Sequence, residues 1–350
     1  MRSSSRIILY LFLVSVLFAI AYLLVQANFS SVTPVVYKQP TPYVRPIPVL
    51  DKSLYDKKSI EVANYGTTTS RTASSTINLW PVKTVYPNAG AILPFKRIVA
   101  YYGNFYSTGM GVLGEYPPQD MLGRLNDEIK KWHLADPNTP ITPAMDYIAV
   151  TAQGSSGPTG KYMLRMPPDQ IEHAIDLASQ VNGIVILDIQ VGQSNLQTEI
   201  PLLKSFLKLP QVHLAIDPEF SMKTGARPGT VIGTYDAEDI NYAANFLANL
   251  VKENNLPPKI LIVHRFTQAM VTHYKKITPL PEVEIVMDMD GWGTPARKIN
   301  SYTEYIQKEP VQFTGIKLFY KNDLWAPSPR MMTPFDILKL KPRPLFIQYQ

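Results

Sequence analysis

Carboxylic acids close several apolar runs of this sequence. Asp217 and Glu219 end one run, and Asp288 and Asp290 end another. Side chains two residues apart on a strand point to the same face, so each pair presents its two groups together. Carboxylates at the ends of buried strands cost stability unless they are paired or solvated. Their concentration therefore indicates a functional site, and two carboxylates flanking one bond are the machinery of glycoside hydrolysis.

Glycoside hydrolysis gives the two carboxyl groups different roles. One has a raised pKa and protonates the leaving oxygen, while the other stays ionised to act as a nucleophile or to activate water. We predict that Glu219 is the acid, because it has the longer side chain at its strand end. Asp288 is the predicted partner, with Asp217 as its competitor. Asp290 directly precedes Gly291, so we expect it to bond the loop that follows and not to act in catalysis.

Polar and aromatic residues near the ends of the apolar runs are candidates for substrate binding. Amide, imidazole and carboxylate groups would hold a sugar through hydrogen bonds, and aromatic rings would stack on its apolar faces. For each aromatic residue, packing within a loop is the structural alternative. The predicted substrate-binding residues are Tyr101, Tyr102, Asp188, Gln190, His264, Trp292, Tyr320 and Gln348, with Tyr106 and Trp325 as further aromatic residues of the rim.

Eight short apolar runs must position these residues. Runs rich in Val, Ile and Leu are typical of strands that are buried on both faces of a parallel sheet. Helix-like segments fill most of the gaps, and 237–254 has a clear apolar stripe. Eight strand–helix units predict an α/β fold, a (β/α)8 TIM barrel over 91–350, with its active site at the strand C-termini. The runs are 97–104, 146–153, 183–191, 212–220, 259–266, 283–291, 313–320 and 343–350.

The composition excludes several other functions. The 350-residue chain is 45% hydrophobic, as globular proteins are, and has no cysteine, which excludes disulfides and thiolate catalysis. Its net charge of +6 resides outside the barrel region, because Arg2 and Arg6 contribute two charges and 28–90 contributes seven basic against three acidic residues. The segment 91–350 is therefore neutral. A nucleic-acid-binding domain would show a basic footprint, so we predict no nucleic-acid partner.

The N-terminal region predicts a membrane anchor followed by a linker. Residues 7–25 carry no charge, and as a helix they would rise roughly 28 Å, enough to cross a hydrocarbon core. Arg2 and Arg6 precede this segment, which places the N-terminus in the cytoplasm and the barrel outside. We therefore expect an anchor over 1–27, with a cleaved signal peptide as the alternative. Residues 28–90 are rich in Pro, Ser and Thr, which predicts an extended linker. As an alternative for its last part, residues 82–93 lie against the barrel.

Several local sequences carry a resemblance to a known group of proteins. They are YYGNFYSTGMGVLGEYP after the first run, then LDIQ, AIDPEF, VIGTYDAEDIN, VHRF and MDMDGWG. Over most of 97–350 the chain resembles exported bacterial TIM-barrel proteins of glycoside-hydrolase-like type. The resemblance implies a barrel, export and carbohydrate chemistry. The chain departs from better-known families because its fourth run has Asp-Pro-Glu in place of a DxxDxDxE sequence or an Asn-Glu pair.

A divalent metal site is the alternative chemistry for the same residues. His264 with Asp188, Asp217, Glu219 and Asp288 offers the nitrogen and oxygen ligands of a metal-dependent hydrolase. Barrel amidohydrolases usually carry a His-x-His pair on the first strand, and the first run has no histidine. We therefore predict no metal ligands and no cofactor. The expected function is a membrane-tethered glycoside hydrolase that acts on a polysaccharide outside the cytoplasm, with a non-catalytic glycan-binding barrel and a metal-dependent hydrolase as alternatives.

Overall fold

The computed structural model describes residues 49–65 and 78–350. The predicted membrane segment, 7–25, lies outside these residues, so the anchor stays a prediction. Within the two described ranges, no helix has the length and hydropathy needed to cross a bilayer.

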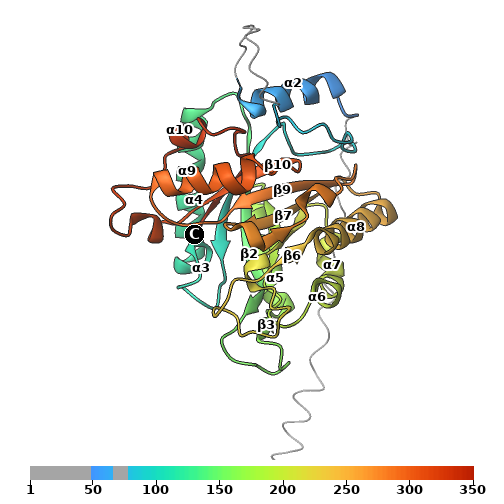
Figure 1. The fold of residues 1–350 in the computed structure, drawn as a ribbon, viewed down its shortest axis with the longest axis vertical. Coiled ribbons are helices and arrows are strands. Elements are labelled where there is room, and N and C mark those ends of the chain that lie inside the picture. The colour runs from blue at the N-terminus through green and yellow to red at the C-terminus, as the bar shows by residue number, and fades with distance from the viewer. Residues whose placement is uncertain (1–48, 66–77) are drawn as a thin grey trace, which may run out of the picture. The chain divides into compact units, whose positions relative to one another are not determined.

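Eight parallel strands form a closed barrel (Figure 1). The sheet closes because β11 pairs with both β10 and β1, and β1 also pairs with β2. Each of the eight predicted runs overlaps one of these strands, although β2 begins at Ile141, before its predicted run, so the prediction of a TIM barrel is confirmed for its parallel sheet. The strands are β1 (Arg97–Gly103), β2 (Ile141–Ala152), β4 (Ile184–Ile189), β5 (Val212–Ile216), β7 (Lys259–Arg265), β9 (Val283–Met289), β10 (Phe313–Leu318) and β11 (Phe346–Tyr349).

Helices cover the outside of the barrel, but their ring is irregular. The predicted stripe on α8 is confirmed, because Ile240, Ala244, Leu247 and Val251 are all buried. The helical segment after β4 is divided into α6 and α7, and Pro201 lies near the point where α6 ends and α7 begins. The α-helices around the barrel are α3 (Val112–Glu115), α4 (Pro118–Ala135), α5 (Pro168–Gln180), α6 (Leu196–Leu202), α7 (Lys204–Leu207), α8 (Ala237–Asn254), α9 (Pro295–Tyr302) and α10 (Pro334–Ile337).

Short elements fill the remaining connections. Between β7 and β9 the chain forms only 3₁₀ turns, η2 (Gln268–Met270) and η3 (Tyr274–Lys276), and the strand β8 (Val271–Thr272). This strand pairs with β6 (Tyr235–Asp236) outside the barrel. The other short elements are β3 (Met163–Arg165), which pairs antiparallel with β2, η1 (Pro218–Phe220), the π-helical turn η4 (Thr303–Gln307) and η5 (Asn322–Leu324).

The barrel interior changes from apolar to polar along the strands. Alternate residues of a strand point inward, and successive inward positions form layers. The layers near the strand N-termini are apolar and buried, and they include Ile98, Ala100, Ile186, Ala215, Ile262 and Phe346. The next inward positions toward the C-termini are polar but equally buried: Asp146, Asp188, His264, Asp288 and Gln348. The polar end of the barrel is therefore the end where a site is expected.

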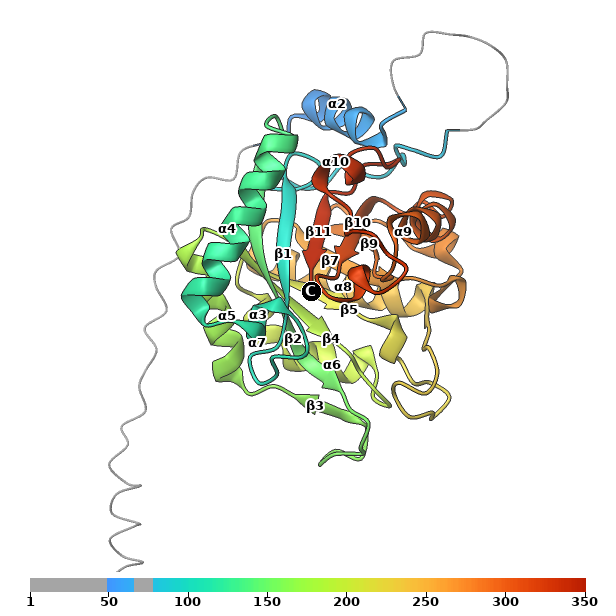
Figure 2. The same ribbon diagram turned by 90° about the vertical axis from the view of Figure 1, so that its left-hand side faces the viewer.

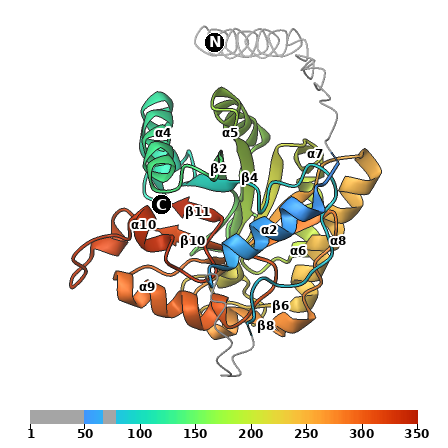
Figure 3. The same ribbon diagram turned by 90° about the horizontal axis from the view of Figure 1, so that it is seen from above.

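A helix covers the N-terminal end of the barrel, within the segment predicted as an extended linker. Residues Lys52–Ala63 form α2, so the prediction of extended chain is wrong there (Figures 2 and 3). The Asp51 side chain accepts a hydrogen bond from the Leu54 N–H and caps the first turn. Tyr55 is buried edge-on to Phe95 and packs into the apolar end of the barrel. Tertiary packing and a cap therefore order residues whose Pro- and Ser-rich surroundings predicted a linker.

Candidate active site

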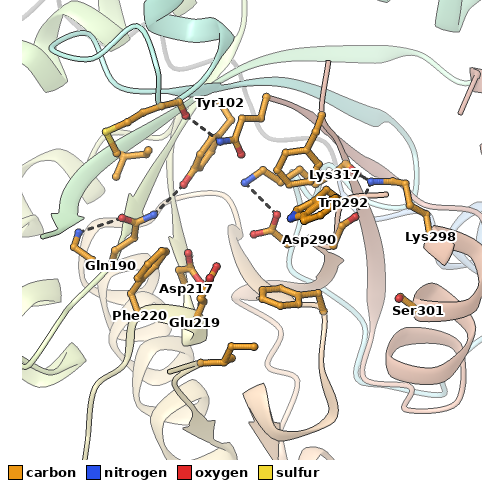
Figure 4. A pocket seen from close by; sticks show the side chains of 18 of the residues that line it. Tyr102, Gln190, Asp217, Glu219, Phe220, Asp290, Trp292, Lys298, Ser301 and Lys317 are labelled. Atoms are coloured by element: carbon orange, nitrogen blue, oxygen red, sulfur yellow. Dashed lines mark hydrogen bonds and ion pairs between the residues drawn. The ribbon is translucent and has the colours of Figure 1, made fainter. Parts of the chain in front are cut away.

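A cavity of about 610 Å³ lies at the C-terminal end of the barrel strands (Figure 4). This is the end at which TIM-barrel enzymes place their catalytic groups. Polar groups and aromatic rings from several different strands and loops meet there. Its polar lining includes Tyr102, Gln190, Asp217, Glu219, Asp290 and Lys317, and its aromatic lining includes Phe220, Phe266, Trp292 and Phe319.

Asp217 and Glu219 form one wall, immediately after β5. Pro218 starts the 3₁₀ turn η1, and the Asp217 side chain caps that turn by accepting the Glu219 N–H at 2.9 Å. The Glu219 carbonyl accepts the Gly233 N–H at 2.7 Å. A Cβ on Gly233 would lie 2.5 Å from the Pro218 oxygen, so the returning loop approaches this turn as only glycine allows. The Glu219 backbone is therefore held on both sides while its side chain reaches the cavity.

Burial makes these two carboxyl groups weaker acids. Burial, together with the negative charge of Asp290, raises the pKa of Glu219 to about 7. Burial also raises the pKa of Asp217, whereas the positive charge of His264 lowers it. Glu219 is half-buried and lines the cavity, so it is the group that can give a proton to a bound molecule near neutral pH.

Asp290 and Lys317 form the opposite wall as an ion pair. Lys317 Nζ lies 3.1 Å from Asp290 Oδ1, and it also lies over the Tyr102 ring, 3.7 Å from the centroid. Burial lowers the pKa of Lys317, but Asp290 and Asp188 raise it by more, so the ammonium stays charged. The Asp290 carboxylate therefore faces the cavity, and the ammonium group of Lys317 balances its negative charge.

A hydrogen-bonded pair completes the polar lining near β1 and β4. Gln190 Nε2 donates to the Tyr102 hydroxyl at 3.1 Å, and Gln190 Oε1 accepts the Ala152 N–H at 3.1 Å. Burial, together with the charge of Asp188, raises the pKa of Tyr102 well above its usual value. The phenol therefore keeps its proton and can act as a hydrogen-bond donor to a ligand.

A fully buried polar layer lies beneath the cavity floor. His264 Nε2 lies 2.8 Å from Asp188 Oδ2, and Nδ1 lies 3.2 Å from Asp288 Oδ2 and 3.6 Å from Asp290 Oδ2. Burial lowers the pKa of His264, but the charge and hydrogen bond of Asp188 raise it by more, and the net shift is strongly upward. Gln348 Nε2 donates to Asp146 in the same layer. The imidazolium therefore links the buried aspartates to Asp290.

The structure distributes the residues predicted for the site among three places. Glu219, Asp217, Tyr102, Gln190 and Trp292 line the cavity. The predicted partner Asp288 and the predicted binding residues Asp188, His264 and Gln348 lie in the buried layer and do not line it. Tyr101 and Tyr320 point away from the barrel axis.

The outward position of Tyr101 and Tyr320 follows from strand alternation. Their hydroxyl groups lie 3.1 Å apart, and the Tyr320 ring stacks on Tyr349. Trp132 of α4 donates to the Tyr349 hydroxyl at 2.9 Å, so this cluster packs between the barrel and α4. Consecutive strand residues point to opposite faces, and because Tyr102 points inward, Tyr101 has to point outward.

Several residues that line the cavity do not follow from the sequence predictions. Among them are Asp290, for which the sequence predicted a bond to the following loop, and also Lys317 and Phe319. The signal for the last two was alternation within β10 and its extension, because Gly315, Lys317 and Phe319 share the inward face. Gly315 also leaves room for a carboxylate, since a Cβ there would lie 2.5 Å from Asp288 Oδ1.

The ligands of the alternative metal centre are engaged with one another. Both ring nitrogens of His264 face aspartate oxygens, and Asp217 Oδ1 accepts a backbone N–H. In the part of the chain that the structure describes, no group of three or more His, Asp or Glu side chains has the arrangement to hold a metal ion.

Comparisons with known proteins add a distant likeness. No family model and no curated protein matches the chain. It is similar to a xyloglucan-specific endo-β-1,4-glucanase of glycoside hydrolase family 5, from a metagenomic library and in complex with cellotriose, with 12% identity and a TM-score of 0.32 over 64% of this chain and 76% of that one. It is also similar to a Bacteroides ovatus xyloglucanase of the same family in complex with a XXXG heptasaccharide, with 12% identity and a TM-score of 0.37 over 76% and 73%.

The barrel is established by its closed order of eight parallel strands. The resemblance noted in the sequence is confirmed for that barrel, while export stays a prediction.

Proposed function

We propose that this protein is a glycoside hydrolase that binds a polysaccharide in the cavity at the C-terminal end of the barrel. One observation carries the proposal: two carboxyl groups in different electrostatic surroundings face one cavity lined with aromatic rings. Glu219 has a pKa raised to about 7, and Asp290 is paired with the ammonium group of Lys317. Unequal surroundings of this kind separate an acid from an ionised carboxylate.

The chemistry follows from these two groups. Glu219 donates its proton to the glycosidic oxygen as the bond from that oxygen to the anomeric carbon breaks, and the bonding electrons go to the leaving oxygen. Asp290 stabilises the positive charge that develops on the sugar ring. The buried Asp288 takes no part in this step, because it accepts a hydrogen bond from His264 beneath the floor. Asp217 acts as a positioning residue by holding the Glu219 backbone.

Reducing-end release by the full chain tests the proposal on a panel of bacterial and plant polysaccharides. Glu219→Gln should lower the rate by about 10²–10⁴-fold while leaving binding of the same glycan largely intact, because only the proton donor is lost. Glu304→Gln is the matched control, since Glu304 is an exposed acid that pairs with Lys308. Glycan binding without release by the wild-type chain would support a non-catalytic binding barrel instead. Unchanged release by Glu219→Gln would contradict the assignment of the acid.

The configuration of the first product defines the role of Asp290. A direct attack by its carboxylate followed by hydrolysis retains the anomeric configuration, whereas activation of a water inverts it. Proton NMR of the product formed in the first minutes distinguishes the two routes. A product of either configuration that still forms in Asp290→Asn at the wild-type rate would contradict both.

We also propose that residues 7–25 anchor the protein and place the barrel outside the cytoplasm. The uncharged length of this segment and the preceding Arg2 and Arg6 support this orientation. Alkaline phosphatase fused after residue 48 should be active, because the phosphatase folds only after export. Fluorescence of green fluorescent protein fused at the same place, with an inactive phosphatase fusion, would contradict the orientation.

A further inference from the structure

Arg297 differs from the other cationic side chains at the cavity. Among the described residues, the lysines and arginines that line the cavity are Arg297, Lys298 and Lys317. Lys317 pairs with Asp290, and Lys298 pairs with Asp323 at 3.1 Å. No carboxylate in the described ranges lies within 4.0 Å of the Arg297 guanidinium nitrogens, although the side chain lines the same cavity. Its charge is therefore available to a ligand.

The guanidinium group of Arg297 lies against the loop that precedes α9. Its central carbon lies 5.2 Å from the centroid of the Trp292 ring. The aliphatic part packs on Gly293, where a Cβ would lie 2.9 Å from Arg297 Cδ. The Gly293 N–H and Lys298 Nζ both donate to Asp323, which is fully buried. The loop that precedes α9 is thus tied to the core, and Arg297 packs on it from the first turn of that helix.

This arrangement suits a planar anion. A guanidinium that lies over an aromatic ring keeps the N–H groups of its edge available. Those N–H groups match the two oxygens of a carboxylate in a bidentate pair. A ligand carboxylate at Arg297 would therefore complete the charge pairing that the protein itself leaves open.

Exposed aromatic rings lie beside the same group. Trp292 is 40% exposed and Trp325 is 56% exposed, and their rings meet edge to face with centroids 5.1 Å apart. Exposed indole rings stack on the apolar faces of sugars. Figure 4 shows Trp292 on the same side of the cavity as Asp290 and Lys317. A sugar that bears a carboxylate would meet both an aromatic surface and a cation there.

The charges deeper in the cavity do not oppose such a ligand. Lys317 balances Asp290, and Glu219 is largely protonated below pH 7, because burial raises its pKa to about 7. We propose that Arg297 is a specificity-determining residue that binds the carboxylate of a uronic acid unit, so that the substrates are acidic polysaccharides. This inference rests on the proposed function and names the class of substrate for that site.

Binding to matched pairs of oligosaccharides tests the inference. The full chain carrying Glu219→Gln, which keeps the ligand intact, is titrated by calorimetry with oligosaccharides of polygalacturonate, alginate and hyaluronate, each beside its carboxyl-reduced form. At least one acidic form should bind about tenfold more tightly than its reduced form, the size of one charge-assisted pair. Adding Arg297→Gln should bring that ratio to about one, and Arg297→Lys should leave an intermediate ratio, because lysine keeps the charge but not the fork.

Lys130→Gln is the control for loss of one positive charge. Lys130 lies on α4, is 73% exposed and does not line the cavity, so the ratio should stay at its original value. Equal binding of all acidic and reduced pairs would overturn the inference, and so would an acid preference that survives Arg297→Gln. Equally tight binding of a sulfated neutral glycan would overturn the assignment to a carboxylate.

Failure of the inference and failure of the proposed function give different results. An acid preference that disappears in Arg297→Gln supports the role of Arg297 even when the wild-type chain cleaves none of the three polymers. In that case only the proposal of hydrolysis is contradicted. Cleavage of a neutral polysaccharide with no acid preference overturns the inference and leaves hydrolysis standing.

Discussion

Each end of the barrel holds a glutamic acid with a raised pKa, but the surroundings of the two side chains differ. Burial raises the pKa of Glu219 to about 7 at one end and that of Glu284 to about 8 at the other. Glu219 lines the cavity, whereas Glu284 is fully buried and accepts the N–H groups of Ile92 and Leu93 at 3.0 and 2.6 Å. A raised pKa therefore indicates burial, and access to a cavity separates a catalytic candidate from a structural one.

The segment 78–96, which precedes β1, produces this difference. Leu93 is fully buried and packs with Tyr55 of α2 and with Ile98 of β1 in the apolar end of the barrel. Nearer the start of the same segment, Trp80 Nε1 donates a hydrogen bond to the Gln307 carbonyl at 2.8 Å. At the opposite end the chain instead forms irregular loops, and these leave a cavity above the buried polar layer.

Asp288 and Asp290, at the end of β9, should give the largest difference in kcat/KM between two variants. Asp290→Asn should lower kcat/KM by about 10²–10⁴-fold, because the carboxylate that faces the cavity loses its charge. Asp288→Asn should lower it by less than about tenfold, the effect of weakening one hydrogen bond to His264 beneath the floor. Steady-state rates of both variants on the same polysaccharide check this. A larger loss in Asp288→Asn would place the ionised partner in the buried layer.

Glu284→Gln should act on stability instead of on turnover. The amide of glutamine leaves one of the two backbone N–H groups without an acceptor, which costs about 1–3 kcal/mol of the free energy of unfolding. The pKa of Glu284 is raised from 4.5 to about 8 in the folded chain, so its contribution is complete below pH 4.5 and is lost as the pH rises through about 8. The difference between wild type and variant should therefore shrink from pH 5 to pH 9 in urea unfolding. A difference that grows with pH would contradict the raised pKa.

The fall of kcat/KM at alkaline pH should depend on Glu219 and not on Glu284. Because Glu219 must carry a proton, kcat/KM should fall about tenfold per pH unit once the pH exceeds about 7. The same limb should persist in Glu284→Gln, since that group does not reach the cavity. Rates measured between pH 5 and pH 9 check this. A rate that stays constant up to pH 9 would mean that Glu219 is not the acid.

Lys317→Met should move this limb by a smaller amount. The positive charge of Lys317 lowers the pKa of Glu219, so its removal should shift the alkaline limb of kcat/KM to higher pH. Methionine keeps most of the side-chain length without the charge. The shift is measured against wild type in the same buffers at low salt, where charge effects are screened least. A shift to lower pH would contradict the electrostatic role of Lys317.

Strand alternation predicted the barrel and the inward face, but it could not predict depth. Asp288 and Asp290 both point inward, yet their positions are about 6.6 Å apart along the strand. That distance places one in the buried layer and the other at the cavity. Burial at this level depends on how far each strand extends, which the local sequence does not encode.

Two other errors have different physical origins. Tyr101 was predicted at the rim although alternation with Tyr102 already placed it outside, so the sequence held the information. The order of α2 was not predictable from composition, because it depends on packing of Tyr55 against Phe95 and on contacts of Asn64 with the Leu338 and Leu340 carbonyls. These contacts join residues far apart in the chain.

Glu219→Gln and Glu284→Gln, measured side by side, test the central claim most directly. Reducing-end release and urea unfolding are recorded for both full-length variants at pH 6. We predict that Glu219→Gln loses release and keeps its stability, whereas Glu284→Gln loses stability and keeps its release rate at temperatures where it is folded. Loss of release by folded Glu284→Gln, or wild-type release by Glu219→Gln, would contradict the assignment of catalysis to the open end of the barrel.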